Sequence, residues 1–264
     1  CSGHAYSVFL YFRVSSPALD VCMRRQRYMG IRDCVGVYVL GPRLGRWDSR
    51  GRSRPITISN VPFLALGSLM LCVGWFGFNV MSAATISGIS GLVAVNSLMA
   101  MVGGILVVLW ISKNDPGFIH NGALAGLVSI CAGSDKVHPL GALIIGGLAG
   151  AIFVKGFTWE QEKLKIDDVL GVWPLHGICG SWGGIACGIF GQESLGGLGG
   201  VSILAQIIGS VAAIVIALTS GFIVYKTLDS LFGIRLEADE EMKGSDLTIH
   251  KLESYPEDVT SRFS

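Results

Sequence analysis

The amino-acid sequence predicts an all-α protein that crosses a membrane several times, and three observations lead to this fold class. Hydrophobic residues fill 51% of the 264 positions, charged residues fill only 15%, and the mean hydropathy is +0.58. Soluble domains carry about 25% charged residues, so this chain has few charges to cover a water-exposed surface. The 58 residues between Arg54 and Lys113 include no Asp, Glu, Lys or Arg. About 20 apolar residues cross a bilayer, so this stretch accommodates two spanning helices and a turn.

Six spanning helices are expected, each an apolar run bounded by turn-forming or charged residues. Their expected ranges are 61–82, 90–112, 117–134, 137–155, 168–191 and 202–226. The turn between the first two falls in residues 83–88, which are small and polar. The 37 glycines suit membrane helices that pack closely. The net charge of +1, together with the absence of a basic segment interleaved with aromatics, excludes a nucleic-acid partner.

Basic residues in the short loops predict the orientation of the chain. The segment 41–60 carries five arginines against one aspartate, which places it on the cytoplasmic side of the plasma membrane. The arginines are Arg43, Arg46, Arg50, Arg52 and Arg54. Alternating the six spans then puts the C-terminal tail on the same cytoplasmic side.

The first 36 residues do not continue this pattern. Four arginines and an aspartate stand where another apolar span is expected, at Arg24, Arg25, Arg27, Arg32 and Asp33. Each charge at bilayer depth costs about 2.5–3.5 kcal/mol on insertion scales. The apolar run 6–12 is too short, and lacks the cleavage site, for a clean signal peptide.

Aromatic residues near the outer end of the first span form the first candidate site. Trp75 and Phe78 are three residues apart, and Ser82 follows one turn later. Such a group can bind a cation on aromatic faces, with the Ser82 hydroxyl accepting an N–H bond. The alternative is an interfacial aromatic belt combined with core packing, and the residues alone leave both open.

His176 is the second candidate, because an ionisable residue deep in an apolar span is a functional-site hypothesis. Burial keeps an imidazole neutral, and a neutral ring donates from one nitrogen and accepts at the other. His176 could therefore relay a proton or line a path for a small polar solute. The alternative is a core histidine bonded to a neighbouring helix.

Other chemistry finds little support in the sequence. Four of the seven cysteines lie in apolar spans, where they serve as small hydrophobic residues, and no metal spacing or disulfide framework occurs. The spans hold no phosphate loop, paired carboxylates or nucleophile–base set, which argues against an enzyme or pump. Asp167 and Asp168 stand at a helix start, where helix capping is the simple role for one of them. No metal or cofactor is expected.

From about residue 37 to residue 253 the chain resembles the ammonium transporter family. The matching stretches are Leu40–Arg46, Gly74–Asn79 with Ser82, Asn121–Val128, His138–Gly146, Ile166–Asp168 followed by Leu175–Gly180, and, in the tail, Gly233–Arg235, Asp239–Glu241, Gly244–Asp246 and His250. Their order along the chain makes the resemblance far more specific than any one of them.

The resemblance implies an eleven-helix fold of which this chain holds the sixth to eleventh helices, assembled as a homotrimer. It implies ammonium recruitment at Trp75 and Ser82, a phenylalanine gate at Phe78 and a pore lined by His176. Deprotonation would release ammonia to cross the pore, and methylammonium is a possible further substrate. The family's carboxylate at the cytoplasmic pore end would fall on Asp167 or Asp168.

The resemblance also assigns roles to the tail, which would couple subunits and meet a PII-type regulatory protein. The tail residues concerned are Gly233, Arg235, Glu241, Gly244 and Asp246. It divides the chain into an N-terminal segment 1–36, a partial transmembrane domain 37–232 and a cytoplasmic tail 233–264.

One departure from the family concerns the first pore histidine, whose expected position holds Gln26. We therefore expect residues 1–36 to be out of frame, or the chain to be a truncated translation. The alternatives to transport are a non-transporting remnant and a regulatory or sensor subunit of the same family.

Overall fold

The computed structural model describes residues 31–54, 56, 58, 60–83, 88–244 and 246–251, and in these residues the regular structure is helical. One isolated β-bridge joins Trp47 and Ser53 in the loop before α3. Residues 31–40 form a helix. The further helices are α3 (Val61–Ser82), α4 (Ser90–Ile111), α5 (Pro116–Ile130), α6 (Pro139–Trp159), η1 (Glu160–Leu164), η2 (Trp173–Ile178), α7 (Cys179–Phe190), η3 (Glu193–Leu195), α8 (Ile203–Phe232), α9 (Ala238–Lys243) and η4 (Asp246–His250).

The expected spans correspond to helices of the structure, with differences at their ends. Both ends of α3 and the start of α4 coincide with the prediction. The third span is shorter than expected, since α5 ends at Ile130, and the fourth and sixth, α6 and α8, extend to Trp159 and Phe232. The fifth begins at Trp173 as the π-helix η2 and continues as α7.

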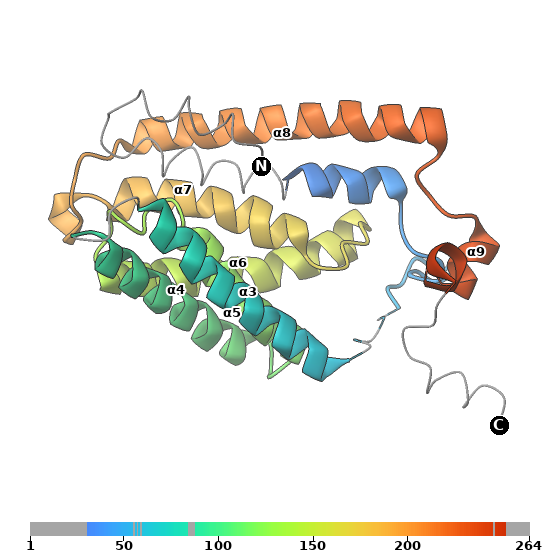
Figure 1. The fold of residues 1–264 in the computed structure, drawn as a ribbon, viewed down its shortest axis with the longest axis horizontal. Coiled ribbons are helices and arrows are strands. Elements are labelled where there is room, and N and C mark those ends of the chain that lie inside the picture. The colour runs from blue at the N-terminus through green and yellow to red at the C-terminus, as the bar shows by residue number, and fades with distance from the viewer. Residues whose placement is uncertain are drawn as a thin grey trace.

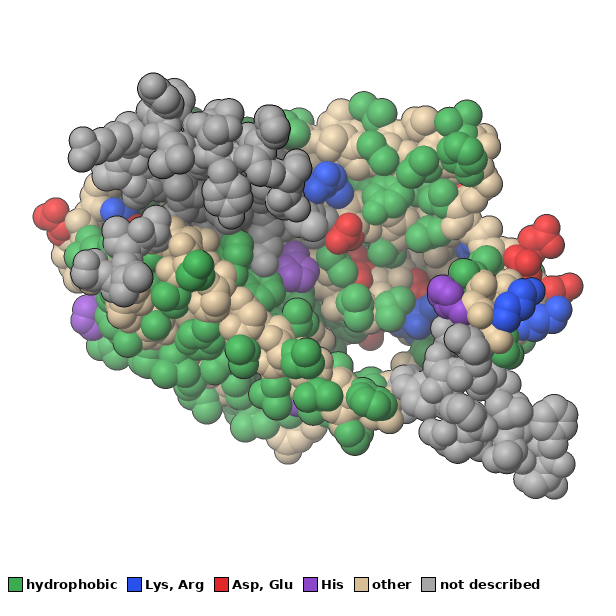
Figure 2. Space-filling model, viewed as in Figure 1, with side chains coloured by type: hydrophobic (Ala, Val, Ile, Leu, Met, Phe, Trp, Pro, Cys, Tyr) green, Lys and Arg blue, Asp and Glu red, His purple; other side chains and the backbone are tan. Residues whose placement is uncertain are grey.

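In the described part of the chain, four helices are long and apolar enough to cross a membrane, at Val61–Ser82, Ser90–Ile111, Pro139–Leu164 and Ile203–Phe232. Large apolar side chains remain exposed on the outer helices, such as Met70 on α3 and Ile223 on α8. Figure 2 shows hydrophobic side chains spread over this face of the molecule. Such surfaces are stable against lipid or a partner rather than water.

Helix starts follow from capping residues in the sequence. Asn60 and Asp115 accept the backbone N–H groups of Phe63 and Phe118, which satisfies donors that have no partner inside the helix. A proline stands in the first turn of α3, α5 and α6, where its missing N–H removes no helical bond.

Helices α3 to α7 form a bundle, and α8 runs along one side of it (Figure 1). The helix 31–40 lies between α8 and the bundle, and α9 lies at the end of α8 that faces the tail (Figure 1). Within the bundle, α4 packs tightly on α5 and α6 through small residues. A methyl group added to Gly126 or to Gly146 would collide with the carbonyl oxygen of Ala100, so backbone meets backbone at this crossing.

Candidate functional site

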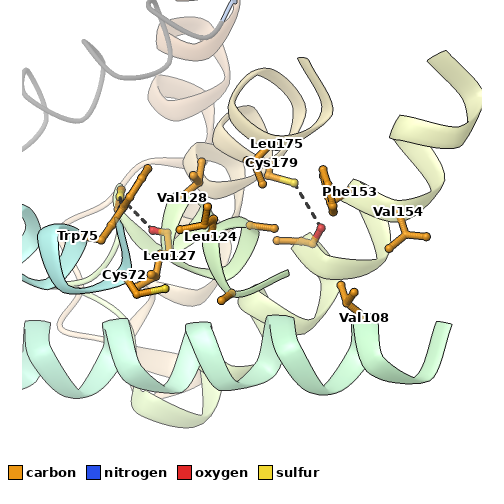
Figure 3. Close-up of a cluster of buried hydrophobic side chains, with 14 residues drawn as sticks. Cys72, Trp75, Val108, Leu124, Leu127, Val128, Phe153, Val154, Leu175 and Cys179 are labelled. Carbon is orange, nitrogen blue, oxygen red and sulfur yellow. Dashed lines mark hydrogen bonds between the residues drawn. The ribbon is translucent and has the colours of Figure 1, made fainter. Parts of the chain in front are cut away.

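The structure brings together two side chains that the sequence marked independently, Trp75 of α3 and His176 of η2. Their rings are stacked, with centroids 6.1 Å apart and planes inclined by 17°. Trp75 is 7% exposed and belongs to the main buried cluster, whose members are drawn in Figure 3. Packing therefore fixes the indole ring beside the imidazole ring.

A network of buried hydrogen bonds holds the indole ring of Trp75 in place. Its Nε1–H donates to the sulfur of Cys131, the residue that follows the end of α5, at 3.0 Å. The Cys131 thiol lies 3.0 Å from the carbonyl oxygen of Leu127 and 3.3 Å from Oδ1 of Asn79, and it can donate to either acceptor. Asn79 in turn donates to Ser97 on α4, at 2.9 Å. Three helices thus set the orientation of one ring.

Sequence reasoning assigned Cys131 no role beyond that of a small apolar residue. The thiol is buried in the structure, as that assignment requires, and it is also a hydrogen-bond partner of Trp75. Nothing in the residue pattern distinguishes the two roles, because a cysteine that packs and a cysteine that also accepts an N–H bond look identical in an apolar run. The contact depends on the crossing of α3 and α5.

Phe78 and Ser82 continue along α3 from Trp75, one and two turns nearer its end. Phe78 is half-buried and packs against the main buried cluster. Ser82 is the last residue of α3 and is half-buried. Core packing, the alternative weighed for this group, is thus present for Trp75 and Phe78, alongside the ring contact with His176.

His176 lies in the middle of η2, and the structure offers no hydrogen bond from its imidazole to another described residue. The thiol of Cys179, three residues further along, lies 3.3 Å from the carbonyl oxygen of Ala149 on α6, a contact drawn as a dashed line in Figure 3. Within the described residues, His176 is therefore not a core histidine that is hydrogen-bonded to a neighbouring helix. Within the described residues, neither ring nitrogen has a hydrogen-bond partner.

Asp167 forms a buried ion pair with two arginines of the loop before α3. Arg43 donates to it from the backbone nitrogen, from Nε at 2.7 Å and from Nη2 at 2.8 Å, and Nε of Arg46 donates at 3.1 Å. Burial acts to raise the pKa of Asp167, but the bonds and charges of the arginines outweigh it, so the pKa lies below its usual range.

Asp168 has a different role from its neighbour. Its Oδ2 accepts the backbone N–H of Trp173 at 2.8 Å, where η2 begins. The contact lies at the start of the helix, as the sequence led us to expect, but the N-cap residue of η2 is Val172 and not one of the two aspartates. The two aspartates therefore anchor the start of η2. Asp167 binds the arginine loop (residues 41–60), and Asp168 binds the helix that carries His176.

The tail packs against the same arginine loop. Arg235 donates to the carbonyl oxygens of Leu40 and Pro42, and it forms an ion pair of 2.9 Å with Glu241. Glu241 also accepts the backbone N–H of Leu44, at 2.8 Å. These contacts place the tail and the arginine loop at one end of the molecule, as expected from their charges.

The structure places the remaining tail residues named from the resemblance at turns and at a helix start. Gly233 and Gly244 have φ angles of +67° and +94°, which favour glycine, and they bound the stretch that holds α9. Asp246 begins η4. Position 26, expected to depart from the family, lies outside the described residues. Among the described residues, no group of three or more His, Cys, Asp or Glu could hold a metal ion.

Comparison with known proteins matches residues 30–255 to the model of the Ammonium Transporter Family. Ammonium transporter Amt2 of Methanocaldococcus jannaschii is 44% identical over 224 residues, which are 84% of this chain and 53% of that protein. Ammonium transporter Amt1 of the same organism is 38% identical over 231 residues, which are 87% of this chain and 59% of that protein. The chain thus spans about half the length of the curated relatives it matches.

Solved structures agree with these relatives. A sensor Amt protein superimposes with a TM-score of 0.77 at 28% identity, covering 86% of this chain and 58% of that one. Mep2 of Candida albicans superimposes with a TM-score of 0.71 at 25% identity, covering 81% of this chain and 51% of that one.

Proposed function

Because the chain belongs to the ammonium transporter family and is a multi-pass membrane protein, we propose that it forms part of a path for ammonium across the plasma membrane. In this proposal the outer end of α3 recruits ammonium and His176 lines the pore through which ammonia passes. The stacked pair of Trp75 and His176 is the observation that carries the proposal.

Recruitment by an aromatic ring explains how ammonium is selected. Ammonium and potassium ions are similar in size, so a pore of fixed width does not separate them. The face of an indole ring attracts a partly dehydrated cation, and a hydroxyl such as that of Ser82 accepts an N–H bond that potassium does not offer. The hydrogen bond from Trp75 to Cys131 supports this role, since it holds the ring in one orientation.

Passage beyond the aromatic residues favours the neutral molecule. An unpaired cation in a dry apolar pore has a large desolvation cost. Ammonia is uncharged, so its desolvation cost is much smaller. Phe78 would close the pore above His176, in keeping with its half-buried position on α3. A neutral imidazole with two available nitrogens can then accept from ammonia and donate to it in turn.

The charges of the loops support a cytoplasmic position for the tail. The arginine loop would lie inside, because basic residues collect on that side, and Arg235 ties the tail to it. We propose that Asp167 and Asp168 mark the cytoplasmic end of the path. The tail from Gly233 to Asp246 would couple the subunits of a homotrimer and could be contacted by a PII-type protein.

Transport by the chain itself distinguishes this proposal from a remnant or a sensor subunit. The chain is reconstituted into liposomes that enclose a pH dye, and pulses of ammonium, methylammonium or potassium are applied. We expect a saturable signal for ammonium and none for potassium, with Trp75→Leu raising the half-saturation concentration about tenfold. Trp110→Leu is the control, since Trp110 is 84% exposed on α4. A chain in liposomes that gives no saturable ammonium signal would refute the proposal.

A further inference from the structure

A cavity of about 550 Å³ lies between the helix 31–40, η1, η2 and α8. Most of its lining is apolar and comes from all of these elements, as in Val35, Leu164 and Phe222. Cavities of roughly 300–1,000 Å³ with such walls and a few polar groups are typical of small-molecule sites. Neither Trp75 nor His176 lines it, so it is separate from the pair described above.

Glu160 is the acidic residue in the wall of this cavity, and its carboxylate is buried. The residue is 1% exposed, and its Oε2 has no hydrogen-bond partner in the part of the chain that the structure describes. Asp167, in contrast, is equally buried but is paired with Arg43 and Arg46. A buried carboxylate without a hydrogen-bond donor is unfavourable. A ligand that carries N–H groups and a positive charge would bind Glu160 favourably, through hydrogen bonds and through charge pairing.

The other polar and aromatic groups of the cavity suit the same kind of ligand. Trp173, Tyr38 and Thr219 line it as well, so two aromatic rings and a hydroxyl belong to its wall. Aromatic faces next to a carboxylate are the combination that binds organic cations. Among the described residues, no lysine or arginine lines the cavity. The described lining therefore favours a cation over an anion.

The position of the cavity on α8 indicates that the ligand has an apolar tail. Leu218, Phe222 and Ile223 line it and are 42%, 50% and 60% exposed, so the wall continues onto the apolar outer surface of a spanning helix. Figure 2 shows acidic side chains (red) and apolar ones (green) next to each other on the face below α8. A molecule can reach Glu160 from the bilayer only if most of it is compatible with hydrocarbon.

We propose that this cavity binds an amphiphilic primary ammonium ion, with its N–H groups on Glu160 and its alkyl tail along α8. The site goes beyond the proposed transport function and does not depend on it, because it uses none of the recruiting or pore-lining residues. Free ammonium lacks the tail that the apolar wall contacts, and an alkyl alcohol lacks the charge that Glu160 contacts.

Calorimetric titration of the chain in phosphatidylcholine nanodiscs tests the proposal. Choline headgroups carry no N–H, so the surrounding lipid does not compete for Glu160. The probes are n-hexylammonium chloride, n-hexanol and ammonium chloride, each corrected for partition into empty nanodiscs. We expect saturable binding of hexylammonium, weakened about tenfold by Glu160→Gln and unchanged by Glu162→Gln. Glu162 is the matched control, because it stands two residues away in η1 and is exposed.

Hexanol and ammonium are each expected to bind at least about tenfold more weakly than hexylammonium. The proposal is overturned if hexanol binds as tightly, if ammonium competes equally well, or if folded Glu160→Gln binds like the unaltered chain. Leu218→Trp provides a second variant, which fills the cavity and keeps Glu160. It should abolish binding, and unchanged binding would also overturn the proposal, whatever the outcome of the transport experiment.

Discussion

The imidazole ring of His176 stacks on the indole ring of Trp75, with centroids 6.1 Å apart and planes within 17° of each other. One ring comes from the middle of α3 and the other from a π-helical turn more than 90 residues later. Stacked aromatic pairs at such centroid distances are attractive and restrict both rings. In the proposed mechanism, a cation held on the indole face would therefore lie next to a group that can exchange hydrogen bonds with ammonia.

Replacing His176 by Ala should lower the rate of ammonium transport about tenfold or more, because the pore loses its polar partner for ammonia. The rate is measured in liposomes at equal amounts of folded protein. His138→Asn serves as the control, since His138 caps α6 from the surface and Asn also caps helices. Unchanged transport with reduced folded yield would indicate that His176 acts only in packing.

Replacing Cys131 by Ala should raise the half-saturation concentration for ammonium by about threefold to tenfold and leave the maximal rate nearly unchanged. The reason is that Trp75 loses the acceptor of its indole N–H while the substrate path is untouched. Cys131→Ser restores an acceptor and should restore the half-saturation value. Cys72→Ala, at another buried cysteine, should have no such effect. A change in maximal rate alone would contradict the role of Cys131 in positioning Trp75.

Loss of the Asp167 carboxylate should destabilise the folded state by about 3 kcal/mol at neutral pH, since the buried guanidinium of Arg46 loses the negative charge paired with it and keeps only neutral acceptors such as Ser53. The pKa of Asp167 in the folded state lies below its ordinary value of 3.8. The stabilisation is therefore fully present above the ordinary value and is lost as the pH falls through the lower, folded-state value.

Thermal unfolding of the unaltered chain and of Asp167→Ala measures this effect. The difference in midpoint temperature should be constant from pH 7 to about pH 5 and shrink below about pH 4. Asp229→Asn is the comparison, because Asp229 forms an exposed ion pair with Lys226 and such pairs contribute about 0–1 kcal/mol. A difference that grows on acidification would show that the sign of the pKa change is wrong.

Glu241→Ala should release the tail from the arginine loop, since Glu241 bonds both Arg235 and the backbone of Leu44. We expect trypsin to cleave after Lys243 several times faster than in the unaltered chain, because cleavage follows the population of the released tail. Asp239→Ala is the control, at an exposed position of the same helix α9. Equal cleavage rates in the two variants would show that these bonds do not hold the tail.

Gly146→Ala should destabilise the bundle by about 1–3 kcal/mol, because the added methyl group meets the backbone of Ala100. Gly67→Ala on α3 has open space around the added methyl group and should be neutral or stabilising. Midpoint temperatures of unfolding, measured at one scan rate, compare the two. If both variants unfold together, the contact at Ala100 is looser than described.

Helix positions were predictable because they depend on local signals. The start of α3 follows from Asn60 and a proline after it, and its end from the small polar turn, so the expected range 61–82 matches Val61–Ser82. The start of the fifth span was placed too early. The sequence contains the charged pair Asp167 and Asp168, but it does not show that a loop to residue 172 is needed before η2 begins.

Individual site residues were predictable only where their type is unusual for its surroundings. A histidine or a tryptophan stands out within an apolar, glycine-rich helix. A cysteine in an apolar run, or a glutamate near a helix end, does not. The contacts of Cys131 with Trp75 and the burial of Glu160 arise from helices that are distant in the sequence. A single sequence contains no direct record of such crossings.

The close approach of Ala100 to Gly126 and Gly146 also limits how the bundle can move. Helices that touch backbone to backbone cannot slide or rotate past one another without steric overlap, and α4 meets α5 and α6 in this way at the same residue. The three helices therefore behave as a single stiff body. If the chain gates a path, the motion would fall to side chains such as Phe78, or to α8 and the tail, which lie outside this contact.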